Sequence, residues 1–179
     1  MDAKALLQRQ TEDAYDRVRE RVEGLSDAEY FWEPAPGCWR VFFDERSGRW
    51  DHDYAEPDPD PAPLTTIGWR LAHIATCKVM YHEWAFGRRE LTWLTIPTPG
   101  SSRAAIEMLE EGHGHLVADL QTLAEADLDR PALTNWGEEW PMWRIFLTMI
   151  DHDVHHGAEI GALRDLYRAT GGSGPAGPG

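Results

Sequence analysis

The sequence has 179 residues, of which 42% are apolar, and it carries a formal net charge of −14. This length and apolar content suit one ordinary domain with its own core, and they exclude a chain that is disordered throughout. The 17 basic against 31 acidic residues argue against nucleic acid or an anionic membrane surface as a partner, because both need a basic face. Two cysteines are too few for a disulfide framework or a cysteine-rich zinc module.

The sequence also lacks the signals that would direct it to a membrane or out of the cell. Its N-terminus does not show the charged and then apolar pattern of a signal peptide. No stretch approaches the roughly 18 apolar residues that are needed to span a bilayer. We therefore expect a cytoplasmic protein.

Four segments show the spacing of apolar residues that is typical of amphipathic helices. In chain order they cover residues 3–23, 65–86, 101–125 and 141–169. Polar N-cap residues precede the second and third segments, and Pro141 suits the first position of the fourth. Because no convincing alternating strand pattern occurs, the sequence predicts an all-α, up-and-down four-helix bundle.

The connections between these segments are unequal. Residues 24–64 form a long link between the first and second helices, rich in Trp, Pro and Asp. A link of this length is usually functional unless it contains short elements of its own. Its tryptophans predict an apolar cover over one end of the bundle; they are Trp32, Trp39 and Trp50.

The domain boundary is predicted near the end of the fourth helix. We expect residues 1–170 to form a single domain. Residues 171–179 consist of Gly, Pro, Ser and Ala and are expected to be a disordered tail.

The fourth helix places polar residues on the stripe that it should bury. At about 100° per residue, His152, His156 and Glu159 fall in the same arc as Ile145 and Met149. Burying such groups is costly unless they share a partner, and a divalent metal is the simplest shared partner. Histidines at i and i+4 let one helix offer two ligands. The alternative is a hydrogen-bonded His/Glu cluster that holds no metal.

A third protein ligand would have to come from another helix. His73 on the second helix and His113 on the third are the two candidates, and helical spacing alone favours His73 only slightly. Cys77 lies one turn beyond His73, where it could face the site or act as a small buried apolar residue.

The sequence resembles the DinB-like (YfiT-like) superfamily of metal-dependent enzymes. The resemblance rests on residues 65–74, which read TTIGWRLAHI, and on residues 152–167, which include HHGAEIG and LRDLY. Residues 32–39 are similar to the actinobacterial-type branch of the family. Together these motifs cover most of residues 1–170.

The resemblance implies a four-helix bundle that holds one divalent metal through three histidines, which are His73, His152 and His156 in this sequence. The family often has His-His-Arg-Gly-Gln where residues 155–159 here read His-His-Gly-Ala-Glu, so Glu159 would bring a carboxylate beside the metal. Relatives include thiol-dependent isomerases and S-transferases that use mycothiol or bacillithiol, and many members have no assigned reaction.

Three neutral imidazoles leave positions open on a Zn, Ni, Fe or Mn ion, as in catalytic sites. We therefore expect a metal-dependent enzyme that activates a mycothiol-type thiol for attack on a small-molecule substrate. Glu159 would ligate the metal, orient a histidine or act as a general base. The alternatives are a hydrolase that uses a metal-bound water and a non-catalytic, stress-related protein that binds metal or a small molecule.

Two further expectations concern surfaces. Tryptophans before and at the start of the fourth helix could line a substrate entrance or cap the bundle; they are Trp136, Trp140 and Trp143. Amphipathic helices of this kind also suit a homodimer.

Overall fold

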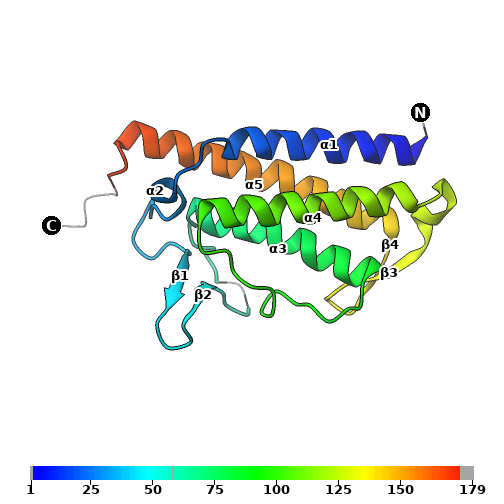
Figure 1. Ribbon diagram of the computed structural model, residues 1–179, viewed down its shortest axis with the longest axis horizontal. Helices are drawn as coiled ribbons and strands as arrows, with labels where there is room; N and C mark the ends of the chain where they lie inside the picture. The colour runs from blue at the N-terminus through cyan, green and yellow to red at the C-terminus, as the bar shows by residue number, and fades with distance from the viewer. Residues whose placement is uncertain (1, 58, 174–179) are drawn as a thin grey trace.

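The computed structural model describes residues 2–57 and 59–173. Four long helices lie side by side as a bundle (Figure 1). They are α1 (Ala3–Val22), α3 (Ile67–Phe86), α4 (Ser102–Thr122) and α5 (Met142–Thr170). The all-α bundle is thus confirmed, and the observed helices match the four predicted segments to within a few residues.

The chain does not simply alternate in direction along the bundle. Helices α3 and α4 run the same way, and residues 87–101 return along the outside of the bundle between them (Figure 1). Contacts between the two helices agree with this, since Gly112 packs on Lys78 while His82 lies 2.6 Å from Asp119. The up-down order expected from the sequence therefore changes at this one connection, which is long enough to span the length of a helix.

Local capping explains where the helices begin and end. Asp2, Thr66 and Ser101 each accept a hydrogen bond from a backbone N–H in the first turn that follows, at 2.7 to 3.1 Å. These side chains satisfy N–H groups that a helix start leaves unpaired. Gly171 ends α5 in the left-handed conformation, with φ 62°.

The core consists of two apolar clusters with a polar layer between them. One cluster surrounds Val18, Leu71 and Leu109, and the other surrounds Leu116, Phe146 and Met149. Between them Lys78 of α3 and Asp153 of α5 form an ion pair at 2.7 Å, with both side chains 1% exposed. This pair links the two helices that carry the histidines of interest.

The link between α1 and α3 contains elements that the sequence analysis did not predict. It holds the short helix α2 (Asp27–Tyr30) and a hairpin of β1 (Val41–Asp44) and β2 (Arg49–His52). A second hairpin, β3 (Pro131–Leu133) with β4 (Glu139–Pro141), precedes α5 and follows a 3-10 helix at Glu125–Asp129. These strands are three or four residues long and contain only two buried residues, so they show no regular alternation of buried and exposed residues.

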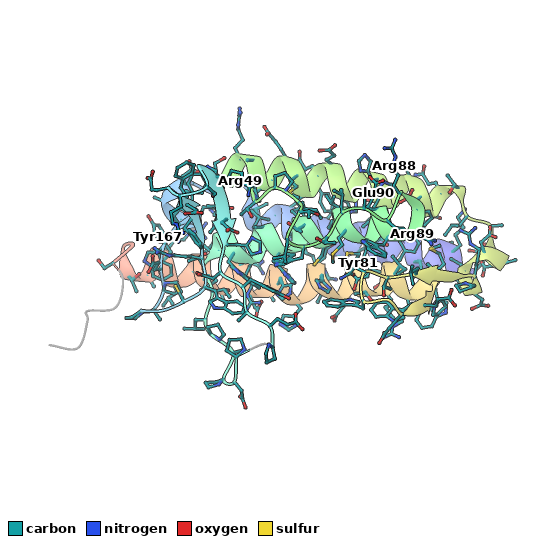
Figure 2. All side chains as sticks on the ribbon, turned by 90° about the horizontal axis from the view of Figure 1, so that it is seen from below. Arg49, Tyr81, Arg88, Arg89, Glu90 and Tyr167 are labelled. Carbon is teal, nitrogen blue, oxygen red and sulfur yellow. The ribbon has the colours of Figure 1, made fainter. Side chains whose placement is uncertain are left out.

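The link covers one end of the bundle, as expected, but its tryptophans have different places. Trp32 packs edge to face on Tyr167 near the end of α5, at 5.6 Å between ring centroids, and Figure 2 shows Tyr167 at this end. Trp50 stacks on Phe31 at 5.4 Å. Trp39 packs instead on Trp69 of α3, at 5.4 Å, where it lines a cavity.

Two further observations concern the C-terminal tail and the possibility of a membrane-spanning helix. Residues 174–179, most of the tail expected to be disordered, lie outside the described residues. Among the residues that the structure describes, no helix is both long enough and apolar enough to cross a membrane.

Candidate metal centre

The structure brings His73, His152 and His156 together. Each offers a ring nitrogen, and these atoms all lie within 4.8 Å of one another. His152 and His156 lie one turn apart on α5, and His73 faces them from α3. Ring centroids are 5.4 Å apart for His73 and His152 and 4.9 Å apart for His73 and His156. Such a cluster of imidazoles is the donor set that borderline first-row metal ions prefer.

Hydrogen bonds set the tautomers of the two histidines on α5. Nδ1 of His152 lies 2.8 Å from the carbonyl oxygen of Thr148, and Nδ1 of His156 lies 2.7 Å from Oε2 of Glu159. A carbonyl and an ionised carboxylate only accept, so each Nδ1 must carry the proton and donate. The Nε2 atom of each ring is then left unprotonated, as a metal ligand must be.

His73 shows the signature of a missing partner. Its ring stacks on Trp69 with centroids 5.1 Å apart, and its Nδ1 is buried with no hydrogen-bond partner among the described residues. Buried ring nitrogens without partners are uncommon in native proteins. Because this one lies beside two further imidazoles, the three side chains fit a bound divalent ion.

Burial keeps these histidines neutral. It lowers the pKa of His152 below the ordinary value and that of His156 to about 4, although the bond to Glu159 opposes the second shift. Burial, followed by the nearby His156 and His152, lowers the pKa of His73 well below its ordinary value. At neutral pH all three rings are therefore in the form that binds metal without first losing a proton.

Glu159 is held between His156 and a cation. Its Oε2 accepts from His156 and lies 3.0 Å from Nε of Arg70 on α3. Burial opposes ionisation of Glu159, but the hydrogen bond from His156 and the charge of Arg70 outweigh it and lower the pKa of the carboxyl. A carboxylate that is already paired twice is better suited to orient His156 than to accept a proton from a substrate. Glu159 also belongs to a second group with His155 and His156, but His155 is 60% exposed.

His113 lies elsewhere in the bundle. It stacks on Tyr15 of α1 with centroids 3.7 Å apart, and it belongs to no metal-binding group among the residues described. Burial and the charge of Lys78 lower the pKa of His113 to about 3. The ring is therefore neutral at pH 7, and its 3.4 Å contact with Glu12 is not an ion pair under those conditions.

Cys77 contacts His73 but does not belong to a metal-binding group among the described residues. Its Sγ lies 3.8 Å from Nε2 of His73. Burial raises the pKa of Cys77 to about 12, so the thiol remains protonated at neutral pH. A protonated thiol is a weak hydrogen-bond partner rather than a nucleophile, and both cysteines of the chain are free.

A cavity of about 720 Å³ opens beside His73. The link between α1 and α3 forms one wall and residues 87–100 form another; Figure 2 shows Arg88, Arg89 and Glu90 where this second segment leaves α3. From α3 the lining includes Trp69, Arg70, His73 and Cys77. From the other segments it includes Trp39, Tyr54, Trp93, Leu94, Asn135 and Trp136. The link is thus a wall of this cavity as well as a cover for the bundle end.

Of the three tryptophans expected at a substrate entrance or cap, one lines the cavity. Trp136 lies in the turn between β3 and β4, is 62% exposed, and its Nε1 donates to the hydroxyl of Tyr81 at 3.4 Å. Trp140 instead lies under the guanidinium of Arg144, at 3.9 Å, and Trp143 is exposed on α5.

Arg70, Trp69 and Trp93 also belong to this region, and none of them was expected there from the sequence. Arg70 had a usable signal, because a charged residue at the start of a helix that is apolar on nearly every face needs a partner. Trp93 had none, since it lies in an irregular segment whose position depends on contacts far along the chain.

Comparison with known proteins places the chain in a family and finds solved structures with a similar fold. The family model of the DinB superfamily matches residues 10–160, so the chain belongs to this superfamily. Among curated proteins none matches. The chain is similar to a DinB-like protein from Bacillus cereus, with 19% identity, a TM-score of 0.60 and coverage of 92% of this chain and 91% of that one.

Two further solved structures share the architecture. A conserved protein from Enterococcus faecalis has 14% identity and a TM-score of 0.59 over 94% of this chain and 99% of that one. A protein from Streptococcus pneumoniae has 11% identity and a TM-score of 0.55 over 94% and 92%. At these identities the likeness concerns the fold alone.

Proposed function

We propose that this protein is a metal-dependent enzyme that uses a low-molecular-weight thiol of the mycothiol type as its nucleophile. The observation that carries the proposal is the cluster of three neutral imidazoles, with ligand atoms within 4.8 Å of one another, beside a cavity of about 720 Å³. A site with three protein ligands keeps positions open for a substrate, which distinguishes catalytic from structural metal sites.

In this proposal His73, His152 and His156 hold Zn, Ni, Fe or Mn. A divalent ion in such a site would lower the pKa of a thiol so that the thiol is present as thiolate. Glu159 fixes the ring of His156 through Nδ1, and Arg70 holds Glu159 in its charged form. Because Cys77 is buried and protonated, the nucleophilic sulfur in this proposal is that of the external thiol.

The reaction would be an S-transfer to a small electrophile bound in the cavity. A new carbon–sulfur bond forms, the leaving group departs with the electron pair of its own bond, and the thiol proton goes to solvent. The aromatic walls around His73 would exclude water from the electrophile, and a thiol-dependent isomerisation would use the same site without loss of a leaving group.

Activity toward chlorodinitrobenzene with a small thiol tests this proposal. The metal-loaded protein should form the thioether and release chloride, and the rate should rise with thiol concentration. His152→Ala should lose this activity, while Asp165→Ala, on the exposed side of α5, should keep it. Thiol-independent cleavage of a nitrophenyl ester would support the hydrolase alternative instead. Metal binding with no turnover of any kind would support a binding protein.

A homodimer is a further part of the proposal. What supports it is a row of exposed apolar side chains on one face of α5, which consists of Trp143, Leu147 and Val154. Burial of such a row against a second copy would remove apolar area from water. Light scattering of the eluted protein tests this, with Leu147→Glu expected to give a monomer. We also propose that the protein acts in the cytoplasm, where two free cysteines are stable.

A further inference from the structure

Four of the rings that line the cavity are in contact with one another. Trp39 packs on Trp69 at 5.4 Å between centroids, and Trp69 lies 6.3 Å from Trp93. Trp93 in turn packs edge to face on His73 at 5.0 Å. These side chains form a continuous aromatic surface from the link to the candidate metal centre. Flat rings bind to such surfaces by stacking and by edge-to-face contacts, in addition to burial of area.

The charged groups of the cavity leave little to attract an anion. Its two charged lining residues among the described part of the chain are Arg70 and Glu56. Arg70 is already paired with Glu159 at 3.0 Å, and Glu56 accepts a hydrogen bond from Tyr54 at 2.6 Å. The net charge of −14 also repels anions at long range. In the metal-free chain a neutral ligand is therefore favoured over an anionic one.

Besides Nδ1 of His73 and Nε of Arg70, which lie at the candidate metal centre, two polar atoms in the wall lack hydrogen-bond partners within the described residues. Nε1 of Trp93 is a donor and Oδ1 of Asn135 is an acceptor, and both are buried. Such atoms are usually paired with water or with a ligand. A molecule with one oxygen acceptor and one hydroxyl or amine donor would match them.

We infer that this cavity binds a neutral, flat aromatic molecule with one or two hydroxyl, carbonyl or amine groups, and that such a molecule, when it also carries a leaving group such as a halide on the carbon that the thiol attacks, is the electrophilic substrate. Pockets of about 300–1,000 Å³ hold drug-sized ligands, so the volume suits a body of about two or three rings. The role of the ligand as substrate depends on the proposed function, whereas its binding does not.

A pair of fluorescent probes with one aromatic frame tests this inference. N-phenylnaphthylamine is neutral, and anilinonaphthalenesulfonate carries an added sulfonate. In the metal-free protein the neutral probe should bind one site per chain, about tenfold or more tighter than the anionic one. Equal affinity for the two probes, or no saturable binding of the neutral one, would overturn the inference.

Variants locate the bound probe. Trp93→Leu and Trp39→Leu should each weaken the neutral probe about fivefold or more, and Trp93→Phe should restore most of the affinity because it keeps an aromatic face. Trp143→Leu, on the exposed row of α5, is the matched control and should bind as the unmodified chain does. Loss of binding in Trp143→Leu but not in Trp93→Leu would place the probe on the helix surface and overturn the inference. Circular dichroism of each variant checks that it is folded.

His152→Ala separates this inference from the proposed function. His152 does not line the cavity, so this variant should lose metal and still bind the neutral probe. Probe binding in an unmodified chain that retains no metal would support the cavity assignment and refute the proposed enzyme. Metal binding in a chain that binds no probe would do the reverse.

Discussion

The carboxylate of Glu159 accepts a hydrogen bond from Nδ1 of His156 at 2.7 Å, and this single contact sets which nitrogen of the ring can reach a metal. Arg70 reaches the same carboxylate oxygen from α3 at 3.0 Å. The orientation of one candidate ligand therefore depends on two residues that need not touch the metal themselves.

Glu159→Ala should weaken metal binding by about 10- to 100-fold, as is usual when a partner that orients a ligating histidine is removed. Glu159→Gln should weaken it less, because the amide oxygen can still accept from His156. Competition with a chromophoric chelator measures both affinities. Unchanged metal affinity in Glu159→Ala, together with lost turnover in both variants, would instead make Glu159 a general base.

Removing only one member of the buried Lys78–Asp153 ion pair should strongly destabilise the folded chain. Lys78→Met leaves a carboxylate in the core and should lower the free energy of unfolding by about 3–5 kcal/mol. The double variant Lys78→Met/Asp153→Leu should recover most of that loss, because no charge remains buried. Urea unfolding of the unmodified chain, the two single variants and the double variant gives the coupling energy between Lys78 and Asp153. If the two single losses of unfolding free energy simply add in the double variant, the account is contradicted.

Because His113 is buried and neutral, we expect the free energy of unfolding to fall as the pH is lowered. Its pKa is about 3 in the folded chain against an ordinary value of 6.5, so the unfolded chain binds a proton first as the pH drops. The stability that depends on a neutral His113 is fully present above pH 6.5, and it is lost as the pH falls toward about 3, the pKa of His113 in the folded chain.

The loss from His113 amounts to about 1.4 kcal/mol for each pH unit in that window. His113→Phe, which can still stack on Tyr15, should reduce the pH dependence of the metal-free protein by this amount. Urea unfolding at a series of pH values tests it, and an unchanged slope would show that His113 is not held neutral.

Two glycines on helices should respond oppositely to alanine. A Cβ at Gly68 would lie 2.7 Å from the carbonyl oxygen of Tyr30, so Gly68→Ala should push α2 away from α3 and cost about 1–3 kcal/mol. A Cβ at Gly114 meets nothing within 4 Å, so Gly114→Ala should stabilise α4 by about 0.5–1 kcal/mol. Thermal unfolding compares the two, and a stabilised Gly68→Ala would contradict the close packing of Tyr30.

Much of the bundle could be predicted because its helices carry their own signals. N-cap residues such as Thr66 and Ser101 mark where helices begin. His152 and His156 stand out in the sequence because they are polar residues on the apolar stripe of α5. Helical spacing alone favours His73 over His113 only slightly, because α3 is buried on nearly all faces. Which of its faces meets α5 depends on the packing of all four helices.

The cavity could not be predicted, for a different reason. Its walls come from the link, from residues 87–100 and from the β3–β4 turn, which are irregular and far apart in sequence. Trp39 and Trp93 have no periodicity that predicts their meeting around Trp69. Their positions follow from contacts that form only when the whole chain is folded.

Metal content tests the central claim most directly. The protein purified without chelators, then loaded and dialysed, should retain one divalent ion per chain, as should His113→Gln, which changes the candidate outside the cluster. His73→Ala, His152→Ala and His156→Ala should each retain far less than one. Full metal content in the His152→Ala and His156→Ala variants, or none in the unmodified chain, would contradict a three-histidine metal centre.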